Sequence, residues 1–369
     1  MSIVYGLIFA DKSMSSLGEL VRHRTSASLP YACRYRLIDF ALSAMQNAGI
    51  RDVGVVMSEN YQSLLDHLGS GKVWDMSRKS GGMRLLPPFD AMNSPRGENV
   101  DVMERLISLE TFISELNADY FLLTTGNLIA NIDCDALFKA HLDSGASVSL
   151  VMNERMGSRE YFPFPVDKEG YVENNRGNLD ENSKLHFLNT AIMSKPTLLQ
   201  MIKLCAIIGN SGSFNYGIQR LIDDGCSIKA FMHEGYAESI DSIQNFYDSN
   251  MVLLNSKLRR ELFTAERPVH TKLGLDLSTY YSEEASCRNS LVADGCMIEG
   301  EVVNSIIFRR VAVKKGAVIR NSIIMQDTVV SEGADLSYVI ADKDVVIGAG
   351  VHLIGSPKLP IVLPKACVL

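Results

Sequence analysis

The sequence is poor in the residues that mark disulfide-linked or zinc-bound proteins. Its seven cysteines are an odd number without any Cys-x-x-Cys pair, which favours reduced thiols over a disulfide framework. Its seven histidines are scattered and no Cys/His cluster is present, so we expect no zinc site. Reduced thiols indicate a cytoplasmic protein.

The sequence also lacks any apolar run near the ~20 residues that span a bilayer. Its apolar first ten residues have neither a basic segment nor a cleavage site, so they predict a β-strand rather than a signal peptide. Thirty-six basic side chains stand against 43 acidic ones, for a net charge of −7. This balance argues against a nucleic acid or a membrane as partner and leaves only a local basic patch for a small anion.

Apolar side chains make up 46% of the 369 residues, which is enough for about two domains with large cores. Over residues 1–257, short apolar runs alternate with helix-length amphipathic segments. The runs at residues 3–9, 52–57, 120–125 and 147–152 predict strands, and the segments at 37–48, 102–116, 133–142 and 242–257 predict helices. This alternation indicates an α/β domain with a doubly wound, mostly parallel sheet.

The pattern changes near residue 288, after a linker that we place at residues 258–287. From 288 to 369, β-branched doublets recur about every six residues, and an Asn-Ser pair recurs at 304–305 and 321–322. Three glycines are spaced by the same 17 residues: Gly316, Gly333 and Gly350. This period predicts a parallel β-helix with one glycine corner per coil. A β-sandwich of short strands is the less favoured alternative, because it has no fixed glycine period.

The turns after the strands are the places to look for chemistry, because ligands of doubly wound sheets bind there. The turn at residues 10–17 has no glycine, whereas a phosphate-cradling turn needs glycines so that backbone N–H groups approach the anion. Asn127 follows the strand at 120–125, where a Mg²⁺ site needs a carboxylate. Asp133 and Asp135 begin a helix, and we interpret them as capping residues.

Three segments carry a resemblance to a known family. The first two read RYRLIDFALS (34–43) and GSGKVWDMSRKSGGMRLLPP (69–88). The third, at 121–135, is a predicted strand followed by Gly-Asn and then by aspartates. They resemble the bacterial glucose-1-phosphate adenylyltransferase (ADP-glucose pyrophosphorylase) family, and the C-terminal solenoid is similar to that family's left-handed β-helix. The resemblance covers nearly the whole chain in order. It implies a fold built to join ATP and glucose 1-phosphate into ADP-glucose and pyrophosphate for glycogen synthesis.

The chain departs from this family at each catalytic motif. The glycine loop is replaced at 10–17, the Lys-Pro-Ala segment by Ser26 and its neighbours, and the sugar-phosphate lysine motif at 173–176. The two metal aspartates correspond to Asn127 and Ser239. Because positioning and charge stabilisation are nearly all of phosphoryl-transfer catalysis, we expect no catalytic residue, metal or cofactor in this chain. The resemblance then implies a non-catalytic, GlgD-type subunit in a heterotetramer with a catalytic subunit that binds Mg²⁺ and ATP.

Two alternatives stay open. An active adenylyltransferase would need Glu238 and Asp241 as atypical metal ligands. A hexapeptide-repeat sugar acyltransferase would need a histidine base, and beyond His270 the chain offers only His352.

An anionic effector, such as a sugar phosphate or phosphate, is the last expectation. One cluster of basic residues lies in the segment that resembles the family's activator-binding region, and a second lies in the solenoid: Arg22, His23 and Arg24, and Arg309, Arg310, Lys314, Lys315 and Arg320. If the fold brings the clusters together, several cations could converge on one anion. We therefore expect Arg24→Glu to abolish effector sensitivity without affecting assembly. Arg34 and Arg36 are instead interpreted as partners of an aspartate inside the fold.

Overall fold

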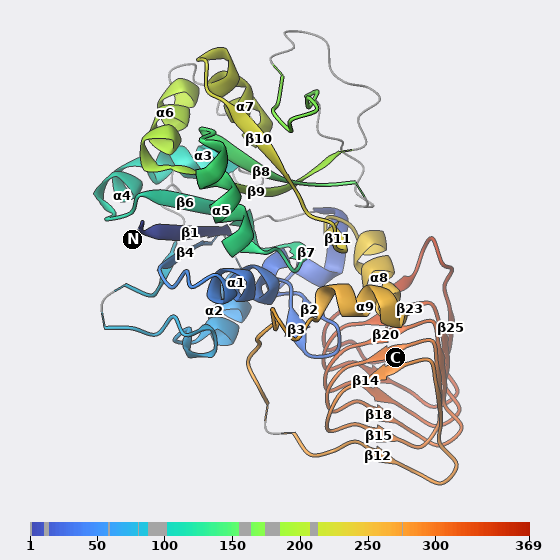
Figure 1. Ribbon diagram of the computed structural model, residues 1–369. Coiled ribbons are helices and arrows are strands. Elements are labelled where there is room, and N and C mark those ends of the chain that lie inside the picture. The colour runs from blue at the N-terminus through green and yellow to red at the C-terminus, as the bar shows by residue number, and fades with distance from the viewer. Residues whose placement is uncertain are drawn as a thin grey trace.

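The computed structural model describes residues 2–10, 15–57, 60–79, 81–87, 102–154, 164–173, 185–206, 213–274 and 276–369. The chain forms an α/β domain and a β-solenoid that lie against each other (Figure 1). Among the described residues, no helix combines the length and hydropathy of a membrane-spanning segment.

A seven-stranded sheet forms the centre of the α/β domain, in the order β10-β8-β9-β6-β1-β4-β5. Strand β9 is antiparallel to both of its neighbours, and the other adjacent pairs are parallel. The prediction of a mostly parallel sheet is therefore confirmed. The strands are β1 (Val4–Phe9), β4 (Val53–Val56), β5 (Met83–Leu86), β6 (Tyr120–Thr125), β8 (Val148–Asn153), β9 (His186–Ser194) and β10 (Ile228–Met232).

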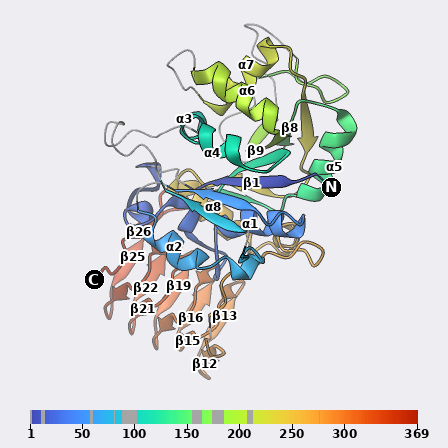
Figure 2. The ribbon, with the colours of Figure 1, turned by 90° about the vertical axis from the view of Figure 1, so that its left-hand side faces the viewer.

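Helices cover both faces of this sheet, as a doubly wound domain requires (Figure 2). One face packs on α3 (Val102–Ser108), α4 (Glu110–Glu115), α6 (Lys195–Ala206) and α7 (Phe214–Asp223). The other packs on α1 (Ile38–Asn47), α2 (Gln62–Leu68) and α5 (Cys134–Ser144). Two further helices, α8 (Ile243–Val252) and α9 (Ser256–Leu262), lie next to the solenoid in Figure 1.

Two of the predicted helices are each divided in two. The segment 102–116 forms α3 and α4, and the segment 242–257 forms α8 and the start of α9. The hydrophobic period runs across both breaks, so it does not reveal them. At the second break, the Asn255 side chain accepts a hydrogen bond from the Lys257 backbone N–H, 3.0 Å, and caps the new helix.

The solenoid consists of three parallel five-stranded sheets, here named by their first strands. The β12 sheet contains β12 (Tyr280–Tyr281), β15 (Met297–Ile298), β18 (Ala312–Val313), β21 (Val329–Val330) and β24 (Val346–Ile347). The β13 sheet contains β13 (Ser286–Arg288), β16 (Glu301–Val303), β19 (Val318–Arg320), β22 (Asp335–Ser337) and β25 (His352–Ile354). The β14 sheet contains β14 (Leu291–Val292), β17 (Ile306–Ile307), β20 (Ile323–Ile324), β23 (Val339–Ala341) and β26 (Ile361–Leu363).

The repeated residues of the solenoid have direct structural roles. The three repeated glycines have φ between 68° and 71°, and the repeated Asn304 and Asn321 also have positive φ, so both sets form left-handed corners. The Ser305 hydroxyl accepts a hydrogen bond from the Ser322 backbone N–H, 3.1 Å, one coil further on. The period thus repeats a corner and a hydrogen bond. The first strand begins at Tyr280, before the predicted boundary of 288, because an aromatic pair takes the place of a β-branched doublet there.

The two domains share one hydrophobic cluster. The outward side chains of the β14 sheet, Ile306, Ile323 and Ile340, pack with Tyr31 and Phe246 of the α/β domain. A buried ion pair adds to this interface, because the Arg24 guanidinium contacts the Asp342 carboxylate at 2.6 and 2.9 Å. The β14 sheet is therefore covered on both faces.

Candidate functional site

Three segments meet beyond the carboxyl ends of β1 and β6, where a doubly wound domain binds its ligand. They are the Gly126-Asn127 turn, the short helix η2 (Ser26–Ser28) and strand β11 (Ala237–Ser239). A Cβ atom built on Gly126 would lie 2.8 Å from the Cβ of Ala27, so the first two segments are in close contact. Strand β11 pairs with β7 (Leu128–Ala130) and places Ser239 opposite Leu128. The fold thus brings together the segments that hold Ser26, Asn127 and Ser239.

Neutral groups occupy the two positions where the family resemblance implies metal aspartates. The Asn127 side-chain amide donates to the backbone carbonyl of Ile240 at 3.0 Å and to the Ser239 hydroxyl at 3.4 Å. Asn127 is 2% exposed and Ser239 is 6% exposed. An amide N–H and a hydroxyl carry no charge, whereas Mg²⁺ is held through carboxylates. The residues present therefore do not fit the metal of the family's reaction.

Of the two alternative metal ligands, Glu238 has its carboxylate engaged in another contact. The Glu238 carboxylate accepts a hydrogen bond from the Asn245 side chain at 3.2 Å. The backbone carbonyl of Asp241 accepts one from the Ser16 hydroxyl. Within the part of the chain that the structure describes, no group of three His, Cys, Asp or Glu side chains is placed to hold a metal ion.

The other sequence predictions have mixed outcomes. Asp133 does cap α5, since its carboxylate accepts the backbone N–H of Ala136 at 2.9 Å. Residues 11–14 of the turn at 10–17 and residues 174–176 of the segment 173–176 lie outside the described residues. His352, the base that an acyltransferase would need, is exposed on strand β25 of the β13 sheet.

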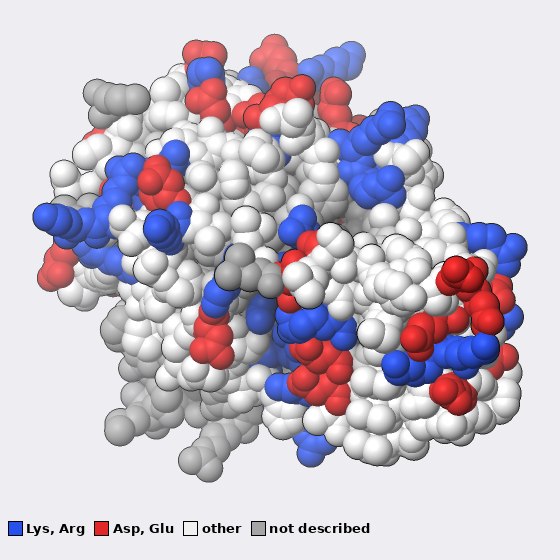
Figure 3. Space-filling view, turned by 90° about the horizontal axis from the view of Figure 1, so that it is seen from below, with Lys and Arg blue, Asp and Glu red and all other residues white. Residues whose placement is uncertain are grey.

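A second candidate site is a cleft between the two domains, with a volume of about 230 Å³. Its walls bring six basic side chains together: Arg34, Arg36, Lys272, Arg309, Arg310 and Lys343. Basic and acidic side chains gather where the domains meet (Figure 3). His67 also lines the cleft, and its ring lies against the buried Trp74 ring with the centroids 5.7 Å apart. The segment that holds Trp74, the only tryptophan of the sequence, therefore supports a wall of the cleft.

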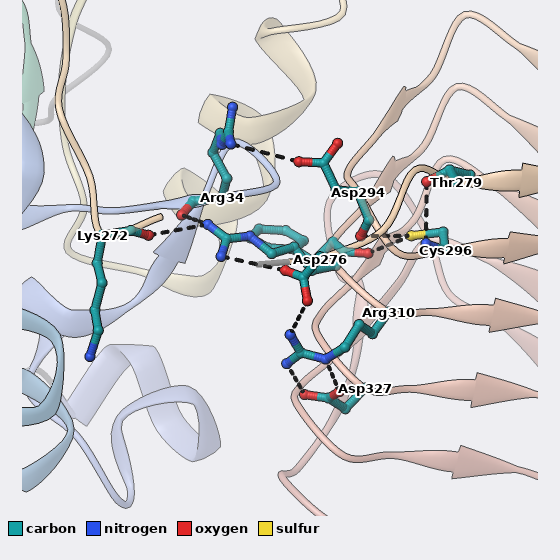
Figure 4. Close-up of polar contacts among 10 residues, drawn as sticks. Arg34, Lys272, Asp276, Thr279, Asp294, Cys296, Arg310 and Asp327 are labelled. Atoms are coloured by element: carbon teal, nitrogen blue, oxygen red, sulfur yellow. Dashed lines mark hydrogen bonds and ion pairs between the residues drawn. The ribbon is translucent and has the colours of Figure 1, made fainter. Parts of the chain in front are cut away.

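Part of this positive charge is neutralised inside the protein. Arg310 contacts Asp327 at 2.6 Å and Asp276 at 2.8 Å, as Figure 4 shows. Arg309 contacts Asp276 at 3.7 Å and donates to the backbone carbonyls of Arg34 and Lys272. The bond from Arg309 to the Arg34 carbonyl joins the solenoid to the α/β domain, and the other bonds tie the solenoid to itself and to the linker.

Arg36 and Lys343 are less well compensated. The Arg36 guanidinium donates to the carbonyls of Ser28 and Ser63 rather than to a carboxylate, and burial lowers its pKa to about 10. Burial, followed by the charges of Arg36 and Arg24, lowers the Lys343 pKa to about 7. Among the residues that the structure describes, the Lys343 ammonium has no ion-pair partner. This end of the cleft is therefore short of negative charge.

The fold brings together only some of the predicted effector residues. Arg309 and Arg310 line the cleft, and Arg24 lies behind it, close enough to Lys343 to influence the lysine's pKa. Arg22 and His23 are exposed elsewhere on the surface. The remaining three residues pair with acids of other solenoid coils: Lys314 with Glu299, Lys315 with Glu284 and Arg320 with Asp335.

Sequence reasoning missed four residues of the cleft: Arg34, Arg36, Lys272 and Lys343. Arg34 pairs with Asp294 of the solenoid at 3.7 Å, so its aspartate lies in the other domain. Asp39, the nearby acid, instead accepts the Arg36 backbone N–H and contacts His67 at 2.5 Å. The two arginines in RYRLIDF were the available signal, but only the fold shows that they lie beside solenoid turns.

The architecture defines a class: a nucleotidyltransferase-type α/β domain joined to a hexapeptide β-helix. In agreement, residues 13–174 match the family model "Nucleotidyl transferase" and residues 278–358 match "GlmU-like, C-terminal hexapeptide". The chain is 32% identical to the glycogen biosynthesis protein GlgD of Bacillus subtilis over 326 residues, which is 85% of this chain and 82% of that one. It is 34% identical to the GlgD of Geobacillus stearothermophilus over 325 residues, with the same coverage.

A more distant match is the glucose-1-phosphate adenylyltransferase of Fusobacterium nucleatum, at 26% identity over 86% of this chain and 84% of that one. The chain belongs to the ADP-glucose pyrophosphorylase family, and within it is similar to GlgD proteins. The family expected from the three sequence segments is thus confirmed.

Proposed function

We propose that this chain is a non-catalytic, regulatory subunit that assembles in the cytoplasm with a catalytic glucose-1-phosphate adenylyltransferase of glycogen biosynthesis. The observation that carries the proposal is the contact of Asn127 with Ile240 and Ser239 at the expected metal position. The similarity to GlgD proteins supports it independently.

The physical argument rests on charge. Transfer of a nucleotidyl group builds up negative charge on phosphate oxygens, and metal ions neutralise it. A buried amide and a buried hydroxyl supply no such ion, and each is already hydrogen-bonded or packed. Loss of a single electrostatic group costs on the order of 10²–10³ in rate, so loss of both metal carboxylates leaves the fold without its chemistry. Mg²⁺ and ATP then belong to the catalytic partner, and the proposed assembly is a heterotetramer.

The interdomain cleft is the part of this proposal that concerns regulation. An anion such as a sugar phosphate or phosphate would meet Arg34 and Arg36 from the α/β domain and Arg309 and Lys343 from the solenoid. Several converging cations bind an anion far better than exposed single pairs. Because the ligand would contact both domains, its binding would change the stability of their junction. That change is a physical route from the cleft to a subunit partner.

Co-expression with the catalytic relative tests the proposal. We expect a stable hetero-oligomer on gel filtration, and we expect the kinetics of ADP-glucose formation to differ from those of the catalytic subunit alone. Arg309→Gln should reduce any response of the complex to phosphate or a sugar bisphosphate without preventing assembly. Absence of a complex at micromolar concentrations would contradict the proposed function.

A further inference from the structure

Lys343 differs from other lysines of the solenoid because its side chain has no counter-ion. Lys314 pairs with Glu299, and Lys315 pairs with Glu284. Lys343 lies partly buried in a wall of the interdomain cleft, and no carboxylate of the described residues contacts its Nζ atom. A charge that loses water without gaining a partner is costly, so this position disfavours an ammonium.

The carboxylate of the preceding residue, Asp342, is occupied by other donors. Its Oδ1 atom accepts the backbone N–H of Lys343 at 2.7 Å and Nη2 of Arg24 at 2.9 Å. Its Oδ2 atom contacts the same Arg24 nitrogen at 2.6 Å. Both oxygens are therefore engaged without the Lys343 side chain, and the acid nearest to it in sequence does not balance its charge.

The surroundings of Lys343 are positively charged and hold unused hydrogen-bonding groups. Arg36, in the same cleft, donates only to uncharged oxygen atoms. The charges of Arg24 and Lys365 also act against an ammonium here. Among the described residues, the buried Nη1 of Arg24 and the buried Oε1 of Gln326, a cleft residue, have no hydrogen-bond partner. The remaining charged or titratable side chains of the cleft are Arg34, His67, Lys272, Arg309, Arg310 and Asp327.

This environment leaves the Lys343 side chain largely as a free amine at neutral pH. Burial, followed by the charges of Arg36 and Arg24, lowers its pKa from 10.5 to about 7. At pH 7.5 about three quarters of the molecules then carry the free amine, against about one in a thousand for an ordinary lysine. A free amine is a nucleophile and an ammonium is not.

We propose that the side chain of Lys343 is a reversible modification site, at which the amine combines with carbon dioxide to form a carbamate. A bond forms between Nζ and the carbon of CO₂, and one C=O π bond opens so that its electron pair resides on oxygen. Nζ releases one proton to the solvent. The reaction needs no oxidant, reductant or leaving group, and it converts a neutral amine into an anion.

The chemistry of a carbamate matches what the site lacks. Its two oxygens are acceptors, and they supply the negative charge that Arg36 does not receive from any carboxylate. Its N–H is a donor, of the kind that Gln326 Oε1 lacks. The cleft of about 230 Å³ has ample room for the three atoms of CO₂. At Lys315, by contrast, a carbamate would place a second negative charge beside Glu284.

The first test is ¹³C NMR of the full chain in buffer equilibrated with ¹³C-labelled CO₂ and bicarbonate at pH 7.5. We expect a carbamate resonance in the wild type that is absent from Lys343→Arg and Lys343→Met and is retained in Lys315→Met. Because an N-terminal amine also forms carbamates, the difference spectrum between the wild type and each variant is the measurement. Identical carbamate signals in the wild type and in folded Lys343→Arg would overturn the proposal.

The second test locates the carbamate in the wild-type chain and needs no variant. A trialkyloxonium salt converts carbamates into stable esters, and mass spectrometry of peptides then identifies the modified lysine. At pH 7.5 we expect Lys343 to be labelled about 100-fold or more above Lys315, because their free-amine fractions differ by more than this. Removal of CO₂ before trapping should abolish the label. Equal labelling of Lys343 and Lys315 would contradict the proposal. Neither test involves the catalytic relative, so both are independent of the proposed function.

Discussion

The guanidinium of Arg24 and the carboxylate of Asp342 form a doubly hydrogen-bonded ion pair across 318 residues of sequence, and both side chains are at least 95% buried. The pair joins the segment after β1 to a solenoid turn. It also lies next to Lys343, whose pKa it influences. Arg24 thus has a structural role behind the cleft rather than an exposed position within it.

Removal of this pair from one side should destabilise the protein. We expect Arg24→Ala to lower the free energy of unfolding by about 3–5 kcal/mol, because Asp342 would remain buried without compensation. Urea denaturation measures the change. Arg22→Ala is the control, since Arg22 is exposed and pairs only with Glu19. A change below about 0.5 kcal/mol for Arg24→Ala would show that the pair contributes little.

The Arg24–Asp342 ion pair changes which substitution is suitable for testing the response to an effector. Arg24→Glu would place a second carboxylate against Asp342 in a buried site, so we expect unfolding or weakened domain contact rather than a clean loss of effector response. Arg309→Gln is a better probe, because Arg309 lines the cleft and is only partly buried. Preserved stability of Arg24→Glu in thermal denaturation would contradict this reasoning.

Restoring one carboxylate should not restore catalysis. We expect Asn127→Asp to release no pyrophosphate from ATP and glucose 1-phosphate with Mg²⁺, because Ser239 stays neutral and the glycine loop is absent. The variant should also be less stable than the wild type, since an ionised aspartate cannot donate to the Ile240 carbonyl. A turnover of about 1 s⁻¹ or more, for the wild type or the variant, would contradict the assignment of a non-catalytic chain.

The lowered pKa of Lys343 predicts how stability depends on pH. Folding lowers this pKa from 10.5 to about 7, so the unfolded chain binds more protons than the folded chain between these values. The free energy of unfolding should therefore rise with pH in this window, by up to about 1.4 kcal/mol per pH unit from this group. Comparison of the wild type with Lys343→Met between pH 7 and 8.5 isolates the effect. Parallel curves of unfolding free energy against pH for the two proteins would contradict this prediction.

The same lysine predicts proton uptake on anion binding. An anion in the cleft favours the charged ammonium, so binding above pH 7 should take up a proton and weaken as the pH rises. Sulfate is a suitable probe because it does not titrate in this range, and calorimetry in two buffers of different ionisation enthalpy counts the protons. Lys343→Met should abolish the uptake, whereas Lys314→Met, outside the cleft, should preserve it. Equal heats in both buffers for the wild type would exclude this linkage.

The sequence by itself determined the architectures of the α/β domain and of the solenoid, because each produces a periodic pattern of residues along the chain. Strand β6 occupies the predicted residues 120–125, and the glycines spaced by 17 residues lie at left-handed corners. The neutral side chains of Asn127 and Ser239, at the positions where the family resemblance implies metal aspartates, could also be identified from the sequence, because their chemistry does not depend on the fold. The helix breaks at residues 109 and 253–255 could not be predicted from the sequence, because the apolar period continues through them.

Only the tertiary structure decided which charges meet. The distance between Arg36 and Lys343, or between Arg24 and Asp342, depends on how the β14 sheet packs against the α/β domain, and no local pattern encodes that packing. Periodicity specifies elements, whereas long-range packing selects which side chains remain exposed.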